Sequence, residues 1–189
     1  MGADHAQAAE GLRPSDIKEL IRTVPDFPAT GVQFRDITPL IANAEGFGAA
    51  IDLLADLVSS TGHDAVAGIE ARGFIFGAAL AQRLGAGFIP VRKAGKLPVK
   101  TIGIDYALEY GSARIELDPT SMSPGERVLL VDDLIATGGT AVAAGQLLRF
   151  AGAIVEQAAF VIDLPELGGA ELLRREGITC HALFAFTGH

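Results

Sequence analysis

The hydrophobic and polar positions of the chain follow two different periods in turn. Short apolar runs of strand length, such as residues 64–69 and 128–131, alternate with segments such as residues 44–60, where apolar residues recur every three or four positions. This pattern predicts strands that alternate with helices. Chains of this kind form an α/β fold, with a mainly parallel sheet and helices on both faces. We therefore expect a single α/β domain.

The same pattern gives approximate bounds for each element. We expect helices at residues 15–23, 44–60, 73–84, 140–150 and 167–176, and strands at residues 64–69, 87–91, 113–117, 128–131, 154–162 and 178–186. Residues 93–110 lack a strong period and contain glycine and proline, which predicts a long loop. Residues 1–13 are alanine-rich and polar, so we expect a disordered N-terminus and one domain over residues 14–189.

Charged side chains follow three of the predicted strands at the point where each strand ends. Arg72 follows the first, Arg92 and Lys93 follow the second, and Asp132 and Asp133 follow the third. In parallel sheets, ligands bind beyond the carboxyl ends of the strands. The fold therefore predicts that these side chains converge on one cleft.

The third of these strands leads into a glycine loop and then a helix. The loop consists of Ala136, Thr137, Gly138, Gly139 and Thr140. Backbone N–H groups of such a loop, together with a helix N-terminus, favour a phosphate. The lysine of a Walker loop and the Gly-x-Gly-x-x-Gly of a dinucleotide fold are both absent. Two carboxylates would repel a bare phosphate, so we expect a ligand that also carries hydroxyls or a metal ion, such as a sugar phosphate.

The run D-D-L-I-A-T-G-G-T at residues 132–140 resembles the motif of type I phosphoribosyltransferases that binds 5-phosphoribosyl 1-pyrophosphate (PRPP), and is most similar to the adenine branch. The segment E-A-R-G-F at residues 70–74 resembles that family's pyrophosphate loop. The segment R-K-A-G-K-L-P at residues 92–98 resembles the start of its mobile lid. The resemblance implies a type I phosphoribosyltransferase fold in which Arg72, Arg92, Lys93 and Lys96 bind PRPP with the aspartates and the glycine loop.

Further segments resemble the parts of this family that contact the base. The resemblance implies that Phe34 stacks on adenine, that Gln33 and Arg35 flank it, and that Leu164 lines the other side of the base. The family more often has an apolar residue in place of Gln33. The segment Y-A-L-E-Y-G at residues 106–111 resembles the one whose glutamate, here Glu109, acts as an acid/base group near the purine N7.

The resemblance implies an enzyme of purine salvage that converts adenine and PRPP to AMP and pyrophosphate. It also implies a homodimer. Magnesium would be held by substrate and by water near Asp132 and Asp133, with no direct protein ligand. Two alternatives stay open: a transferase for another base, and a non-enzymatic regulator that senses PRPP.

Composition narrows the range of partners. The net charge of -8 argues against a general nucleic-acid surface, and the 49% hydrophobic content argues for a folded protein. The four histidines are scattered without a zinc-binding spacing, and the single cysteine, Cys180, lies in an apolar strand pattern, where we expect it to be buried. No apolar run has the length of a membrane span, so we expect a cytoplasmic protein.

Overall fold

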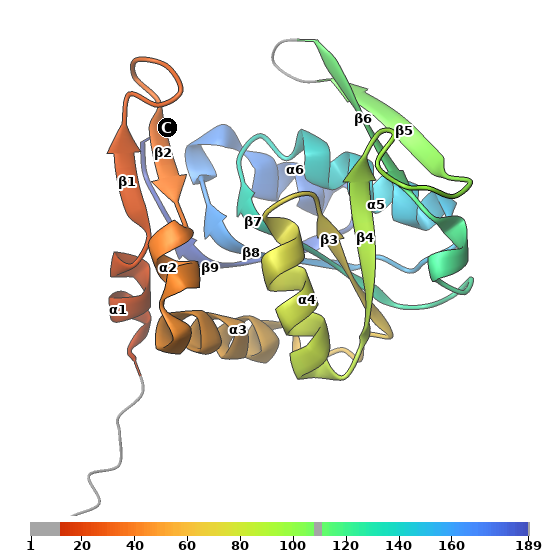
Figure 1. Ribbon diagram of the computed structural model, residues 1–189, viewed down its shortest axis with the longest axis horizontal. Coiled ribbons are helices and arrows are strands. Elements are labelled where there is room, and N and C mark those ends of the chain that lie inside the picture. The colour runs from red at the N-terminus through yellow and green to blue at the C-terminus, as the bar shows by residue number, and fades with distance from the viewer. Residues whose placement is uncertain (1–11, 108–110, 189) are drawn as a thin grey trace, which may run out of the picture.

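The computed structural model describes residues 12–107 and 111–188. Its centre is a seven-stranded sheet with the order β5-β6-β4-β3-β7-β8-β9 (Figure 1). Strands β4, β3, β7, β8 and β9 are parallel, whereas β6 runs antiparallel to β4 and β5 antiparallel to β6. The predicted α/β fold with a mainly parallel sheet is confirmed. The strands are β3 (Ala65–Ile69), β4 (Gly87–Lys93), β5 (Ile102–Ala107), β6 (Ser112–Leu117), β7 (Val128–Ile135), β8 (Gln157–Asp163) and β9 (Thr179–Ala185).

Helices cover both faces of this sheet. They are α1 (Pro14–Glu19), α2 (Thr38–Ala42), α3 (Ala44–Val58), α4 (Gly73–Leu84), α5 (Gly139–Phe150) and α6 (Gly169–Arg175), with short 3-10 turns η1 (Pro119–Ser121) and η2 (Pro165–Leu167). Helices α3 and α4 share one buried hydrophobic cluster, and α5 and α6 share the other. The central strand β7 contributes side chains to both clusters. Its Leu129 and Val131 belong to the first, and its Val128 and Leu130 to the second, as the alternation of side chains along a strand requires.

A separate two-stranded sheet stands at one end of the central sheet. It pairs β1 (Arg22–Pro25) with β2 (Gln33–Asp36) in antiparallel register. In Figure 1 this pair lies to the left and the β5–β6 hairpin to the upper right, with the ends of β3 and β7 between them. The two hairpins therefore flank the edge of the sheet where the predicted site residues lie.

The helix predicted at residues 15–23 is wrong beyond Glu19. Leu20 is its C-cap, and the following residues form β1. The β-branched Thr23 and Val24 disfavour a helix, and Pro25 cannot continue one. The start of the helix is held by Arg13, whose side chain forms an ion pair of 2.9 Å with Asp16, and not by Ser15. Residues 1–11, which contain most of the segment expected to be disordered, lie outside the described residues.

Two strands differ from the sequence prediction in ways that affect the site. Strand β7 continues through the two aspartates to Ile135, because Leu134 and Ile135 pair with β8. The expected loop at residues 93–110 contains strand β5, whose six residues pair with β6. The irregular part is therefore confined to residues 94–101 among the described residues. No helix in the described parts of the chain is long and apolar enough to cross a membrane.

Candidate active site

The carboxyl ends of β3, β4 and β7 lie side by side. Ile69 of β3 is in register with Val91 of β4, and Gly68 is in register with Val131 of β7. The residues that follow each of these positions therefore emerge at one edge of the sheet. This places Arg72, Arg92 and the aspartate pair in one region, as the sequence predicted.

Asp132 and Asp133 form a carboxylate pair with restricted access to solvent. Asp133 is 3% exposed, and its backbone N–H donates to Asp132 Oδ1 at 2.8 Å. Burial and the neighbouring charge on Asp133 raise the pKa of Asp132 well above its usual value. Burial also raises the pKa of Asp133, although the charge of Arg72 opposes the shift. The pair is therefore suited to bind cationic or hydroxyl-bearing ligands, because such ligands favour the ionised form of the two carboxyl groups.

Arg72 connects the aspartates to the neighbouring β1–β2 pair. Its Nε lies 2.8 Å from Asp133 Oδ2, and its guanidinium carbon lies 5.7 Å from the centre of the Phe34 ring. Asp133 is therefore paired with a cation within the protein. The side chain of Arg72 is 45% exposed, so part of its fork of donors can still reach a bound anion.

Glu70 pairs with the next strand and not with Arg72. Its Oε2 accepts from Arg92 Nε at 2.9 Å and from the backbone N–H of Lys93 at 3.0 Å. This contact joins the loop after β3 to the end of β4. The side chains of Lys93 and Lys96 are exposed beyond it, at the start of residues 94–101. Arg92 is therefore engaged within the protein, whereas the two lysines extend from the same edge.

The glycine loop is shaped by contact with a second loop. Gly138, with φ of +84°, is the N-cap of α5, and a Cβ at this position would lie 2.9 Å from the Cα and carbonyl oxygen of Gly169. The backbone N–H of Gly169 donates to the carbonyl of Ala136 at 3.0 Å. A glycine is thus required for packing as well as for its backbone angle. The first N–H groups of α5 have no partners within the helix and remain suited to a phosphate.

Gly73 permits an equally close approach on the other side of the aspartates. A Cβ on this residue would lie 2.8 Å from both Asp132 Oδ1 and the carbonyl oxygen of Val131. The start of α4 can therefore rest directly against the end of β7. This contact holds the loop that carries Arg72 next to the carboxylate pair.

A cavity of about 230 Å³ lies between β2 and the loop after β8. Phe34 and Leu164, which are far apart in the sequence, both line it, as does Arg72. The complete lining is Val32, Gln33, Phe34, Arg35, Arg72, Leu134, Ala136, Leu164 and Leu167. Sequence reasoning missed Val32, Leu134 and Leu167 as lining residues. For Leu134 the signal was its position two residues after Asp132, on the same face of a strand.

The side chains of Gln33 and Arg35 belong to the opposite face of β2 from Phe34, because side chains alternate along a strand. Arg35 is 8% exposed, and its guanidinium donates to Thr23 and to two carbonyls near the C-terminus. Arg35 nevertheless belongs to the lining of the cavity, and its expected place beside the base stays a prediction.

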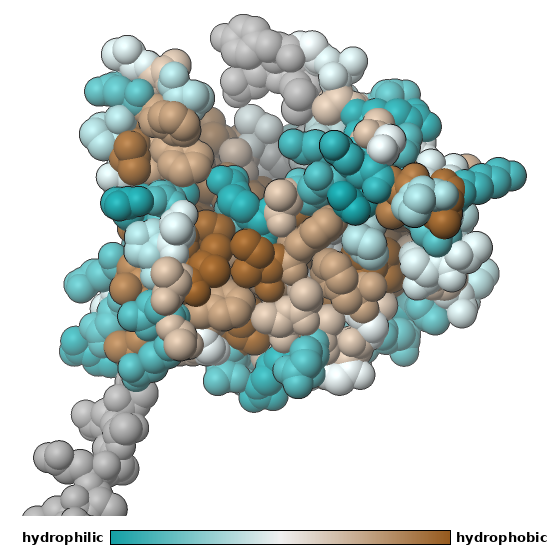
Figure 2. All heavy atoms as spheres, viewed as in Figure 1, coloured by the Kyte–Doolittle hydropathy of each residue, from teal (hydrophilic) through white to brown (hydrophobic). Residues whose placement is uncertain are grey.

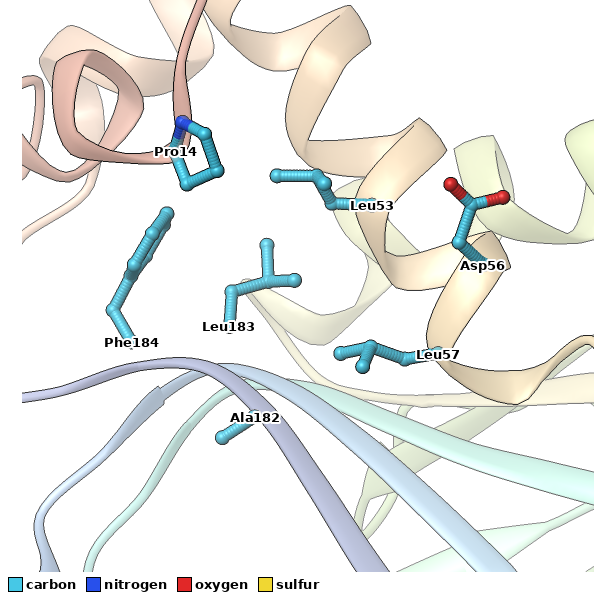
Figure 3. Close-up of a pocket in the computed structure, with 7 residues that line it drawn as sticks. All are labelled: Pro14, Leu53, Asp56, Leu57, Ala182, Leu183 and Phe184. Carbon is cyan, nitrogen blue, oxygen red and sulfur yellow. The ribbon is translucent and has the colours of Figure 1, made fainter.

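Glu109 and its neighbour Tyr110 lie outside the described residues, so the role expected for Glu109 stays a prediction. Cys180 is half-buried, and burial raises the pKa of its thiol to about 11, which is consistent with the packing role predicted for it. A larger apolar cavity of about 320 Å³ lies away from this site, between α1, α3 and β9 (Figure 3). Its lining is aliphatic and aromatic apart from Asp56, and it contains none of the predicted site residues.

Comparisons with known proteins agree with this arrangement. The model of the phosphoribosyl transferase domain family matches residues 40–171. The adenine phosphoribosyltransferase of Novosphingobium aromaticivorans is 67% identical over 178 residues, which cover 94% of this chain and 100% of that relative.

Solved structures with the same fold carry the same name. The adenine phosphoribosyltransferase of Thermoanaerobacter pseudethanolicus has a TM-score of 0.88 and 43% identity over 92% of this chain and 100% of that one. The Saccharomyces cerevisiae enzyme, solved with adenine and an imino-altritol bisphosphate, has a TM-score of 0.84 and 36% identity over 90% of this chain and 98% of that one.

Proposed function

The chain belongs to the adenine phosphoribosyltransferases, and we propose from the geometry of its site how its residues convert adenine and PRPP to AMP and pyrophosphate. The proposal rests on one observation, which is that two binding features lie next to each other. A cradle for an anionic sugar phosphate, with buried carboxylates, adjoins a mainly apolar cavity lined by Phe34 and Leu164. Arg72 contacts both features, so the two substrates would meet beside it.

PRPP would lie along the carboxyl edge of the sheet. The loop Ala136–Thr140 and the N-terminus of α5 would hold the 5-phosphate. Asp132 and Asp133 would accept hydrogen bonds from the ribose hydroxyls and favour the positive charge that develops at C1. Arg72, Lys93 and Lys96 would stabilise the charge that gathers on the departing pyrophosphate, and a group positioned in this way typically lowers a barrier by roughly 2.7–4 kcal/mol.

Arg92 would act mainly on the orientation of this region. Its Nε is bound to Glu70 at 2.9 Å and its guanidinium carbon lies 5.6 Å from the ring centre of Phe74. These contacts fix the end of β4, from which Lys93 extends. The PRPP-binding role predicted for Arg92 would then depend on its remaining donors.

Adenine would occupy the cavity between Phe34 and Leu164. Phe34 supplies an aromatic ring, which packs against the ring of Phe27 in a T-shaped arrangement with 5.2 Å between centres. In the described part of the chain, β2 has one strand neighbour, β1, so its outer edge keeps backbone N–H and C=O groups for a ligand. Recognition through these groups would make the polar side chain of Gln33 harmless to base choice. Adenine N9 would then face C1 of the ribose as pyrophosphate leaves.

Magnesium would enter with PRPP. The described residues contain no group of three or more His, Cys, Asp and Glu side chains able to hold a metal ion. The aspartate pair suits an ion held mainly by substrate oxygens, with the carboxylates reached through water. When bound, the ion would neutralise charge on the pyrophosphate and so favour its departure.

The irregular residues 94–101 and the β5–β6 hairpin would form a lid over PRPP. Lys96 and Lys100 are exposed on this segment and would gain an anionic partner when PRPP binds. Closure of such a segment excludes water, which would otherwise hydrolyse the activated sugar. The part formed by β5 would move as a hairpin, because it is paired with β6 along its length.

A homodimer and a cytoplasmic location are also part of the proposal, and both rest first on the family resemblance. Figure 2 shows hydrophobic residues gathered at the surface between α2 and α4. Ile75 of α4 is 39% exposed, which is consistent with a face that meets a second copy. Light scattering at micromolar concentration would show twice the 19.6 kDa mass of the chain if the homodimer exists, and the monomer mass would contradict it.

The base specificity tests the function itself. The protein, PRPP and magnesium are incubated with adenine, hypoxanthine, guanine or orotate in separate reactions, and the nucleotide products are separated by chromatography. We expect AMP from adenine and little product from the other bases. Efficient product from another base with none from adenine would assign the cavity to that base.

A further inference from the structure

The last described residues of the chain cross from the central sheet to β2. We call residues 186–188 the C-terminal strap. The N–H of Phe186 donates to the carbonyl of Asp163 at 3.0 Å, and the N–H of Gly188 donates to Glu166 Oε2 at 3.1 Å. Figure 1 shows this end of the chain beside β2. The strap is therefore attached to the loop after β8, which contains Leu164 and Leu167 of the cavity wall.

Arg35 attaches the same strap to β2. One terminal nitrogen of its guanidinium donates to the carbonyls of Thr187 at 2.7 Å and Gly188 at 2.9 Å, and the other donates to Thr23 Oγ1 at 2.5 Å. The guanidinium carbon also lies 4.9 Å from the centre of the Phe186 ring. A single buried side chain thus joins β1, β2 and the strap.

These contacts connect the two walls of the cavity. Phe34 precedes Arg35 on β2, so its ring position depends on where Arg35 holds the strand. Glu166 lies between Leu164 and Leu167, so the position of the opposite wall depends on the strap. We propose that Arg35 and the C-terminal strap set the separation of these walls, and that Arg35 is a positioning residue for the base. This inference rests on the assignment of the cavity to adenine.

The proposal predicts different effects on the binding of the two substrates, adenine and PRPP. Loss of the Arg35 fork would remove the donor of the Thr187 and Gly188 carbonyls and allow β2 to move relative to the loop after β8. The base site would loosen, whereas the glycine loop and the aspartate pair are held by contacts of their own. A displacement of this kind lowers the efficiency of a bound substrate by roughly 10- to 100-fold. We expect this effect to appear as a higher KM for adenine.

Five variants test this inference: four single changes and one combination of two of them. Arg35→Met removes the fork, Arg35→Lys keeps the charge, and a truncation that ends at Phe186 removes the two acceptor carbonyls. Arg22→Met is the matched control, because Arg22 is an exposed arginine of the neighbouring strand that forms an ion pair with Asp36 away from the strap. KM for adenine, KM for PRPP and kcat are measured for each variant, together with the melting temperature.

We expect Arg35→Met and the truncation each to raise KM for adenine by roughly 10- to 100-fold while KM for PRPP stays within about twofold. Arg35→Lys should recover part of the loss, and Arg22→Met should match the wild type. Arg35→Met combined with the truncation should be no worse than the more severe single change, because both remove the same contact.

Equal changes in both KM values, or an unchanged KM for adenine in the truncated protein, would overturn the proposal. The truncation keeps the test decisive if Arg35→Met fails to fold. A wild-type protein that makes no AMP would overturn both this inference and the proposed function. Active wild-type protein with unaffected variants would overturn this inference alone.

Discussion

Asp132→Asn should make the protein more stable and less active at neutral pH. Burial and the charge of Asp133 raise the pKa of Asp132 in the folded protein. The folded state therefore binds the Asp132 proton more tightly than the unfolded state does. The stability that this gives is fully present below the unfolded-state pKa and is lost as pH rises through the folded-state pKa. At neutral pH the ionised carboxylate of Asp132 lowers the free energy of unfolding, and asparagine removes this unfavourable charge.

The size of the effect follows from the same contacts. Each unit by which the pKa is raised corresponds to about 1.4 kcal/mol. The Oδ1 of asparagine can still accept the N–H of Asp133, which the carboxylate accepts at 2.8 Å, so no hydrogen bond is lost. Stabilising changes of this kind give roughly 0.5–2 kcal/mol, or about 1–8 °C in melting temperature for a chain of this size. Loss of a charged hydrogen bond to the ribose, about 1.5–3 kcal/mol, should lower kcat/KM by roughly 10- to 150-fold.

Calorimetry between pH 4 and pH 8, with steady-state kinetics at pH 7.5, measures both quantities. The gain in melting temperature should be largest at the alkaline end and shrink as the pH falls, because protonation of Asp132 removes the charge that burial disfavours. Asp52→Asn is the control, because Asp52 is a 61% exposed carboxylate on α3. A lower melting temperature for Asp132→Asn at pH 7.5, combined with normal turnover, would show that the aspartate pair is structural and has no role at the ribose.

Four further predictions concern the substrates and the loops. Phe34→Ala should raise KM for adenine by roughly 5- to 150-fold, the value of a stacked base, and equal changes in both KM values would contradict the stacking role. Gly138→Ala should abolish PRPP binding in calorimetry and should lower the melting temperature more than Gly168→Ala does. Both glycines have positive φ, but only at Gly138 would a Cβ lie 2.9 Å from backbone atoms. Unchanged PRPP affinity would remove the glycine loop from the site. Chelation of magnesium should stop AMP formation, added magnesium should restore it, and full activity in the chelator would contradict the metal requirement. Hydrogen exchange over residues 94–103 should slow more with PRPP and magnesium than with AMP, which lacks pyrophosphate, and equal protection by both ligands would exclude the lid.

The sequence was sufficient for the features that follow from topology. Alternating strands and helices predicted the parallel sheet, and the rule about carboxyl ends then placed Arg72 and the aspartates at one edge. The resemblance to a family placed Phe34 and Leu164 together, although neither period nor spacing connects them. These predictions succeeded because each depends on the backbone path.

Side-chain pairing and short elements were harder to predict. Arg72 and Arg92 both follow predicted strands, and only the structure shows that Arg72 pairs with Asp133 and Arg92 with Glu70. Strand β1 has four residues, too few to show a period beside a helical pattern. The partners of Arg35 are backbone carbonyls 152 and 153 residues away, and a backbone acceptor leaves no mark on the sequence. The contacts between Arg35 and the end of the chain could not be predicted for that reason.

Phosphorus NMR of the complete reaction would show directly whether the protein transfers the phosphoribosyl group to adenine. Protein, magnesium, PRPP and adenine are mixed, and the signals of PRPP, pyrophosphate and AMP are followed in one sample, with a second sample that lacks adenine. We expect AMP and pyrophosphate to appear in equal amounts as PRPP disappears, and PRPP to persist without adenine. PRPP that binds but is not consumed in the presence of adenine would indicate a sensor and contradict the transferase function.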